Sequence, residues 1–217
     1  GRDLRIHGWI CSCELDTSIL GFLGGMSVPA VTRFGYGYVQ GVDEAAKELG
    51  ITSDVELEYV CGGQFYGDAD ITAYMDTWYG SKGVEVVFAC GGGIYTSAAE
   101  AAAKVDGKVI GVDSDQSGII GEDITVTSAM KGLAPTTIDT LTDVIVNGNW
   151  ANYAGKIETL GLALLTILPR TMSSSRSRPR QWADGKFTVE DYTALVADMF
   201  NGKVKSPTNT TVEPTSP

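Results

Sequence analysis

Five short apolar runs recur between residues 19 and 127, and stretches with helical character separate them. The run at residues 84–89 is apolar at nearly every position, which is typical of a strand in a parallel sheet that helices cover on both faces. Short connections between alternating strands and helices favour right-handed parallel crossovers. We therefore expect an α/β fold in which residues 19–146 form one doubly wound parallel sheet.

The boundaries of the expected elements follow from these runs and from the glycines after them. The expected strands are residues 19–23, 55–60, 84–89, 109–112 and 124–127. The expected helices are residues 29–49, residues 71–79, an alanine-rich helix ending at Val105, and residues 134–146. In such sheets a ligand binds beyond the carboxyl ends of the strands. The loops predicted to converge there are residues 24–26, 62–68, 91–95, 113–116 and 128–131, and Met26 in the first of them is a candidate ligand contact.

Length and charge exclude some classes of protein. A chain of 217 residues can bury a real core and could hold one large α/β domain or one and a half smaller ones. Its 27 acidic side chains outnumber its 16 Lys and Arg, which argues against a nucleic-acid partner. No stretch reaches the roughly 18 apolar residues of a membrane span, and the first residues lack the pattern of a secretory signal.

Two segments do not fit the regular pattern. Residues 163–181 contain four arginines and no acidic residue, and residues 2–13 show no clear period. They could be a disordered basic loop, a partner-binding patch or residues translated out of frame. The last is considered because the genetic code permits codons for residues 4–13 and 165–180 that encode a more ordinary protein sequence after a one-base shift. We expect residues 163–181 to form no regular element joined to the core, since four arginines cannot be buried without acidic partners.

The glycine run at residues 91–93 comes after a strand and before a helix. Backbone N–H groups in such a turn can cradle an anion, and the lack of side chains also allows close approach to a neutral ring or sugar. A plain turn is the alternative. The dinucleotide fingerprint G-x-G-x-x-G and the phosphate-binding G-x-x-x-x-G-K-[ST] are both absent, so those two nucleotide sites are not expected.

Two acidic side chains and a lysine follow the later strands. Asp113 comes directly after the strand at residues 109–112, and its carboxylate could accept two hydrogen bonds from a vicinal diol such as that of ribose. Asp115 is the second candidate. Helix capping, acid–base catalysis and metal binding are the alternatives for these acids. Lys131 could pair with Asp113, or could be a solvated surface lysine.

Little else in the converging loops suggests catalysis or a metal. No nucleophile stands beside a base there, and the single histidine, His7, lies in the irregular opening. Cys11 and Cys13 are too few for a zinc site, and we expect Cys61 and Cys90 to be small buried thiols. We therefore expect no enzyme activity, no cofactor and no metal.

The aromatic residues separate into packing and ligand candidates. Phe34, Tyr36 and Tyr38 are spaced by two inside a predicted helix, so they cannot share one face and are interpreted as packing residues. Phe65 instead lies in a glycine-rich loop after a strand, where burial is difficult. It is a candidate to stack on a base, with a plain loop position as the alternative.

Four motifs in a fixed order resemble the basic membrane protein family, which includes the purine nucleoside receptors. They are Gly-Phe-Leu-Gly-Gly-Met at residues 21–26, Phe-Ala-Cys-Gly-Gly-Gly at 88–93, Val-Ile-Gly-Val-Asp-Ser-Asp-Gln at 109–116 and Thr-Ser-Ala-Met-Lys at 127–131. The resemblance covers about residues 19–161, and the third motif is its most specific part.

The resemblance implies one lobe of a type I periplasmic-binding-protein fold that closes on a nucleoside and delivers it to an ABC permease. It also implies a lipoprotein of the bacterial envelope, whose signal and anchor would lie outside this chain. By motif, the glycine contacts carry over to Gly92 and Gly93, the diol-binding acid to Asp113 and the partnering cation to Lys131, with Asp115 less favoured.

Family members begin with a further lobe that nothing before Gly1 supplies, so the chain is expected to be a fragment. We divide it into a ligand-binding α/β lobe at residues 1–150, with residues 1–18 doubtful, and a crossover with a partial remnant of the second lobe at residues 151–217. The remnant would include the irregular residues 163–181 and a disordered tail at residues 203–217.

Three rival functions remain open from the sequence. The same lobe architecture serves as the effector-binding part of transcription regulators of the lac-repressor type, although no basic DNA-reading segment is present. A sugar-binding receptor of the same fold is the second rival. The third is an enzyme that modifies sugars or nucleotides on a flavodoxin-like sheet, which would return an altered product where a receptor returns its ligand unchanged.

Overall fold

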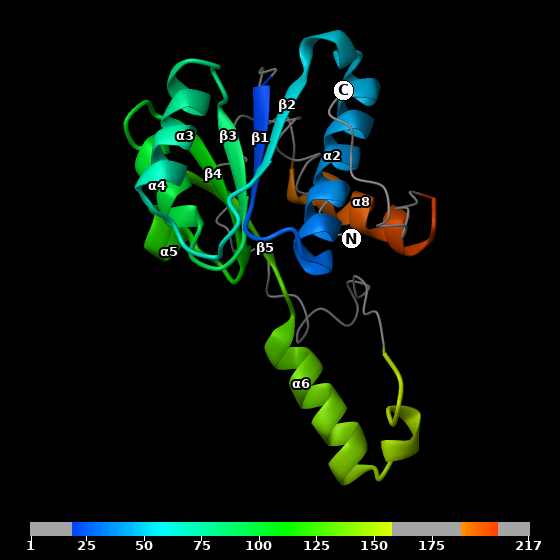
Figure 1. Cartoon of the computed structure of the whole chain (residues 1–217). Helices are drawn as coiled ribbons and strands as arrows, with labels where there is room; N and C mark the ends of the chain where they lie inside the picture. Colours follow the sequence, from blue (N-terminus) through cyan, green and yellow to red (C-terminus); the bar gives the residue numbers. More distant parts are fainter. Residues whose placement is uncertain (1–18, 158–187, 204–217) are drawn as a thin grey trace.

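A computed structural model describes residues 19–157 and 188–203 of the chain. Five parallel strands form one sheet in the order β2-β1-β3-β4-β5, with helices between them (Figure 1). The strands are β1 (Ile19–Gly24), β2 (Glu56–Cys61), β3 (Val86–Cys90), β4 (Lys108–Asp113) and β5 (Thr125–Met130). The predicted single parallel sheet is therefore confirmed.

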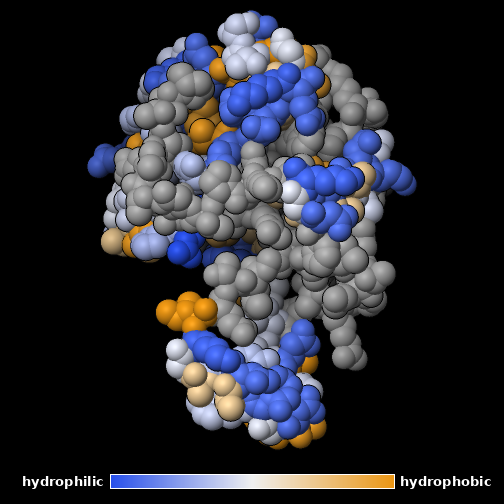
Figure 2. Space-filling view, turned by 90° about the vertical axis from the view of Figure 1, so that its right-hand side faces the viewer, coloured by the Kyte–Doolittle hydropathy of each residue, from blue (hydrophilic) through white to orange (hydrophobic). Residues whose placement is uncertain are grey.

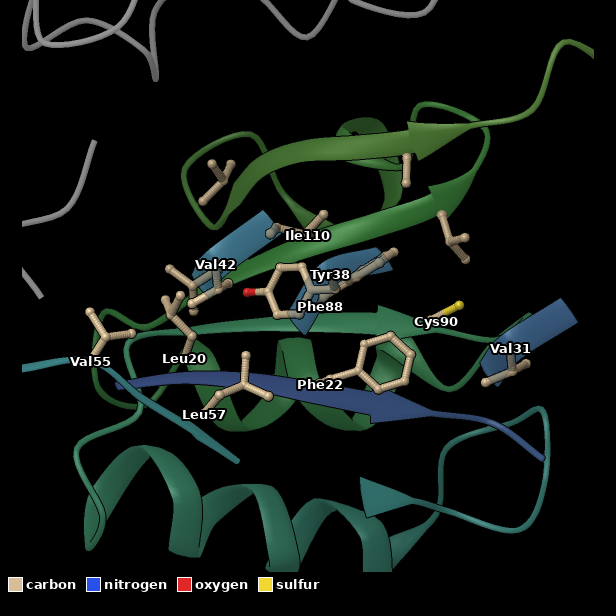
Figure 3. Packing of buried hydrophobic residues seen from close by; sticks show 14 of the residues in the cluster. Leu20, Phe22, Val31, Tyr38, Val42, Val55, Leu57, Phe88, Cys90 and Ile110 are labelled. Carbon is tan, nitrogen blue, oxygen red and sulfur yellow. The ribbon is translucent and has the colours of Figure 1, made fainter. Parts of the chain in front are cut away.

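Helices cover both faces of this sheet, because alternate side chains of each buried strand point to opposite faces. The helix α2 (Pro29–Leu49) packs on one face, where Phe22, Tyr38 and Phe88 meet in edge-to-face and tilted ring contacts (Figure 3). The opposite face packs on α3 (Ala69–Gly80), α4 (Tyr95–Ala102) and α5 (Ser117–Ile120). This two-sided packing is the doubly wound arrangement expected from the sequence.

The ends of the helices follow local capping rules. Asp68 accepts a hydrogen bond from the N–H of Ile71 and so caps the start of α3. Pro29 begins α2, and Gly50 ends it in the left-handed conformation, with its N–H bonded to the carbonyl of Lys47. A short 3₁₀ turn, η1 (Thr52–Asp54), then leads into β2.

The residues after β5 leave the sheet and form an arm. It consists of α6 (Leu133–Leu141), the π-helical turn η2 (Thr142–Val146) and the 3₁₀ turn η3 (Trp150–Asn152), so the single helix expected at residues 134–146 changes its winding at Thr142. Hydrogen bonds from Asn149, Asn147 and Tyr153 to the Asp143 carboxylate close the arm and lower the pKa of that group.

The arm extends away from the sheet and carries apolar side chains on its surface (Figures 1 and 2). Seven large apolar residues of the segment are exposed: Leu133, Ile138, Leu141, Ile145, Val146, Trp150 and Ile157. Such exposure of apolar side chains on one short segment is unusual for a surface in contact with water. Within the described residues, no helix is long and apolar enough to cross a membrane.

One further helix, α8 (Val189–Phe200), lies in the segment for which the sequence predicted only a remnant of a second lobe. Thr188 and Asp191 form a reciprocal capping box at its start. The predictions for residues 1–18 and 163–181, including the shift of reading frame, lie outside the described residues. The same holds for the predicted tail beyond Lys203.

Candidate functional site

A pocket of about 270 Å³ opens at the carboxyl edge of the sheet, on the face that α2 covers. It lies beyond β3 and β4, where the sequence predicted the ligand crevice. Its walls come from the start of α2 and from the ends of β3, β4 and β5. The lining residues are Val28, Ala30, Val31, Phe34, Phe65, Cys90, Gly91, Gly92, Val112, Asp113 and Lys131.

Asp113 ends β4 in an unusual backbone conformation. Its φ of 69° lies in the left-handed region, which few residues other than glycine adopt, although aspartate tolerates it better than most. The N–H of Ser114 donates to the carbonyl of Val112 at 2.8 Å, so Asp113 is at the centre of a γ-turn of the rarer form with positive φ. Backbone strain of this kind clusters at functional sites.

Lys131 pairs with Asp113, as the sequence suggested. The Nζ atom of Lys131 lies 2.6 Å from Oδ1 of Asp113. That oxygen is shielded from water, and its contact with Lys131 is an ion pair rather than a well-aligned hydrogen bond. The backbone N–H of Lys131 also donates to the carbonyl of Asp113 at 3.0 Å, which ties the ends of β4 and β5 together.

The glycine run is shaped by packing against the loops after β1 and β2. A Cβ at Gly91 would lie 2.9 Å from the Cα of Gly25, and one at Gly92 would lie 2.9 Å from the carbonyl oxygen of Phe65. Gly92 lines the pocket, whereas the N–H of Gly93 donates to the Phe65 carbonyl at 2.7 Å. Close backbone packing therefore accounts for these glycines, and the Gly93 N–H already has a partner within the protein.

Two phenylalanines contribute rings to the pocket. Phe65 is 40% exposed in its loop, which matches its interpretation as a ring that is not buried in the core. Phe34 also lines the pocket, and the Lys131 ammonium lies 5.2 Å from the centre of its ring. The interpretation of Phe34 as a packing residue did not include its place in the pocket lining. The statement that these aromatics cannot share one face is wrong for Phe34 and Tyr38, which are one helical turn apart and both contact Phe88.

Two other predicted site residues lie outside the pocket lining. Met26 is 43% exposed. The carboxylate of Asp115 accepts hydrogen bonds from the N–H and the hydroxyl of Ser117, so it stabilises the start of α5. The expected loop at residues 128–131 is also corrected, because β5 continues to Met130 and only Lys131 follows it.

The two cysteines of the described region, Cys61 and Cys90, are thiols that form no disulfide. Cys90 is buried at the floor of the pocket and Cys61 is half-buried, so the prediction of buried thiols is correct for Cys90 only. Burial raises the pKa of the Cys90 thiol, the Asp113 carboxylate raises it further and the Lys131 ammonium opposes this. Within residues 19–157 and 188–203, no group of three His, Cys, Asp or Glu side chains is arranged to hold a metal ion.

The sequence pattern of the family described as ABC transporter substrate-binding protein, PnrA-like, matches residues 6–166. The chain belongs to this family. The PnrA-like family is one of substrate-binding proteins rather than enzymes, so the enzyme reading is set aside.

Curated relatives agree with this PnrA-like assignment. Basic membrane protein B of Borreliella afzelii is 30% identical over 160 residues, which are 72% of this chain and 44% of that protein. The ABC transporter nucleoside-binding protein BmpA of Lactococcus lactis is 36% identical over 108 residues, which are 46% of this chain and 29% of that protein. The chain thus spans less than half the length of these relatives.

Solved structures support the PnrA-like assignment at the level of the fold. A solute-binding protein of an ABC transporter system from Aeropyrum pernix has a TM-score of 0.60 at 21% identity, and the match covers 94% of this chain and 58% of that one. A transcriptional activator of the comK gene from Bacillus halodurans has a TM-score of 0.51 at 21% identity over 68% of this chain and 48% of that one. Transporter receptors and regulators therefore share this lobe architecture.

Proposed function

We propose that the chain forms the ligand-gripping lobe of a receptor that supplies a nucleoside, with a purine base, to an ABC importer. The observation that carries this proposal is the pairing of Asp113 with Lys131 at the rim of a pocket that also presents two phenylalanine rings. An acid for a sugar diol and aromatic faces for a flat base are the two kinds of contact that a nucleoside requires.

The Asp113 carboxylate has the properties needed to hold a ribose. Its Oδ1 atom is shielded and paired with Lys131, while the side chain as a whole is 43% exposed and so is accessible from the pocket. A carboxylate can accept a hydrogen bond from each hydroxyl of a vicinal diol. The Lys131 ammonium balances its charge and has donors left for a ring or hydroxyl oxygen of the ligand.

Phe34 and Phe65 approach the pocket from two separate elements, α2 and the loop after β2. Aromatic side chains that stack on a base contribute roughly 1–3 kcal/mol each without much dependence on the base. They favour a heterocyclic ligand, because a base offers a π-face to both rings and a simple sugar has none. Gly91 and Gly92 bring the backbone close to the same space.

The pocket is smaller than a complete binding site. Its volume of about 270 Å³ is below the ~300–1,000 Å³ of pockets that enclose a drug-sized ligand. We propose that the rest of the full-length receptor supplies the remaining contacts and covers the apolar arm at residues 133–157. The receptor would act at the outer face of the cell membrane as a lipoprotein and pass its ligand to a permease.

A titration of this chain followed by NMR tests the ligand, because NMR detects the weak binding expected of half a site. Adenosine is expected to shift the amide signals of Gly92 and Lys131 and to bind more tightly than 2′-deoxyadenosine, which has lost one hydroxyl of the diol. Asp113→Ala should weaken adenosine binding by about 2 kcal/mol, the lower part of the ~2–5 kcal/mol range for truncating a buried charged partner. The two nucleosides should then bind equally.

Asp115→Ala is the matched control, since Asp115 is two residues away and outside the pocket lining. It should leave the ratio of the two affinities unchanged. D-Ribose is the third probe, and ribose that binds as tightly as adenosine would favour a sugar receptor instead. An adenosine-to-deoxyadenosine ratio that Asp113→Ala does not alter would remove Asp113 from the site.

A further inference from the structure

Gln116 is a buried polar residue directly beneath the proposed site. Its side chain is 6% exposed although it follows a loop of acidic and polar residues. The side-chain Oε1 atom of Gln116 accepts a hydrogen bond from the N–H of Val112 at 2.8 Å. The backbone N–H of Gln116 donates to the hydroxyl of Ser128 at 3.1 Å. Gln116 thus connects β4 to β5 just below Asp113.

The hydrogen bond from the N–H of Val112 to Gln116 takes the place of a hydrogen bond between β4 and β3 that the sheet does not form. The N–H of Lys108 bonds to the carbonyl of Glu85, so the even-numbered N–H groups of β4 point toward β3. The β3–β4 ladder ends at the pair Phe88 and Ile110, two residues before Val112. The two strands separate at this point, and the Gln116 amide satisfies the backbone donor that their separation leaves behind.

The separation of β3 from β4 lies next to the pocket. The Gly91–Gly92 turn follows β3 on one side, and Asp113 ends β4 on the other, and all three line the pocket. The γ-turn at Asp113 starts from Val112, the residue whose N–H Gln116 holds. The position of the Asp113 carboxylate therefore depends on a strained turn that one buried side chain supports.

Gly111 shows how closely Gln116 fits under this turn. A Cβ at position 111 would lie 2.7 Å from Oε1 of Gln116 and 2.7 Å from the hydroxyl oxygen of Ser128. Only glycine leaves space for the amide to fold back under the strand. Gly111 leaves space for the Gln116 side chain, which bonds to Val112 of β4, while Ser128 of β5 accepts the hydrogen bond of the Gln116 backbone N–H.

We infer that Gln116 is a positioning residue that holds the Asp113 turn in its strained conformation and thereby sets the discrimination between ribose and deoxyribose. This inference rests on the proposed nucleoside function for its ligand, but the support of the turn can be tested without any ligand. Gln116 does not line the pocket, so it acts through Asp113 rather than by touching the nucleoside.

The first measurement is amide hydrogen exchange of the ligand-free chain. Gln116→Met keeps a long side chain but removes the acceptor, so the amides of Ser114 and Lys131, whose hydrogen bonds close the turn, should exchange at least about tenfold faster. Amides in the middle of β1 and β3 should keep their protection. Gln40→Met on α2 is the control and should leave Ser114 and Lys131 unchanged.

The second measurement is the ratio of the affinities for adenosine and 2′-deoxyadenosine. Gln116→Met should bring this ratio close to one, as Asp113→Ala does, and Ser128→Ala should lower it in part. Ser128→Ala removes only the anchor of the Gln116 N–H, so it provides a milder variant if Gln116→Met does not fold.

The outcomes separate the two proposals. Unchanged exchange at Ser114 and Lys131 in both variants overturns the positioning role, whatever the chain binds. Faster exchange with an unchanged nucleoside ratio also overturns it, because Gln116 would then serve stability alone. If exchange is faster in the variants but the unmutated chain binds the two nucleosides equally, Gln116 still supports the turn. The proposed nucleoside function is then contradicted.

Discussion

The ring of Phe65 lies directly over Gly25. A Cβ at position 25 would come within 2.5 Å of Cδ1 of Phe65 and within 3.1 Å of the Gln64 carbonyl oxygen. The loop after β1 therefore supports the ring that the loop after β2 presents to the pocket. This contact joins two of the loops that the sequence placed at the same edge of the sheet.

Gly25→Ala should displace the Phe65 ring and weaken adenosine binding. A stacked aromatic ring contributes roughly 1–3 kcal/mol to binding a base, and most of that should be lost. The free energy of unfolding should change by less than about 1 kcal/mol, since Phe65 is 40% exposed and its ring can move into solvent. NMR titration and urea denaturation measure the two quantities. Gly80→Ala, where a Cβ meets no neighbour, is the control for both.

Replacement of Asp113 should reverse the usual order of alanine and glycine. Because φ at Asp113 is 69°, Asp113→Gly should be more stable than Asp113→Ala by about 1 kcal/mol, within the ~1–2 kcal/mol cost of the left-handed conformation. Both variants lose the ion pair to Lys131, so it cancels in the comparison. Urea denaturation of the pair measures the difference. At Asp115, the alanine variant should be at least as stable as the glycine variant. If the alanine variant were also at least as stable at Asp113, the strained turn would be contradicted.

The stability of the chain should fall in alkaline solution, partly through Tyr79. Its hydroxyl is buried and donates to the Lys108 carbonyl at 2.7 Å, and burial raises the pKa of the phenol well above its usual value. The unfolded phenol ionises near pH 10, so above about pH 10 the unfolded state binds fewer protons and the free energy of unfolding decreases.

Tyr79→Phe should lower stability near neutral pH by roughly 1–3 kcal/mol, because the Lys108 carbonyl loses its buried partner. It should also show a shallower fall between pH 10 and about pH 12 than the parent chain. Urea denaturation across this range gives both results. Tyr74→Phe, at an exposed position on the same helix, should retain the alkaline slope. Parallel slopes in all three proteins would contradict the role of Tyr79.

The apolar arm should make this chain self-associate as its concentration rises. Ile138→Lys combined with Ile145→Lys places charge on the exposed face, so sedimentation velocity should show less association while the unfolding midpoint is unchanged. Thr137→Lys combined with Thr142→Lys adds the same two charges at exposed, less apolar positions of the arm and should reduce association less. Equal effects of the variants would mean that net charge, rather than the apolar face, controls association.

The central strands β1, β3 and β4 were predictable because they are buried on both faces. The run at residues 84–89 has little polarity, and its glycine turn marks the end of β3 within a residue. The prediction was less accurate for β5, which continues through Ser128 and Ala129 to Met130. Ser128 resembled a loop residue in the sequence because the partner of its hydroxyl, the backbone N–H of Gln116, comes from another segment.

The candidate site was predictable only where the position after a strand decides it. Asp113, Lys131, Phe65 and Gly92 were predicted as site residues in this way, and all four line the pocket. Gly93, Met26 and Asp115 were predicted by the same reasoning and lie outside the pocket lining. Phe34 was missed as a pocket residue because spacing within α2 says nothing of the loops that lie across from its first turns. Gln116 was missed because a polar residue in an acidic loop looks exposed, and only the separation of β3 from β4 explains its burial.

Three residues of the pocket floor, Val31, Cys90 and Val112, also belong to the core cluster that packs α2 on the sheet. A change of ligand size made by enlarging or shrinking these side chains would alter core packing at the same time. Evolution toward a new ligand is therefore expected to proceed through the rim at Phe65 and Lys131, because Phe34 packs against the same core cluster. Engineers who wish to turn this lobe into a sensor for another metabolite have the same two positions to vary first.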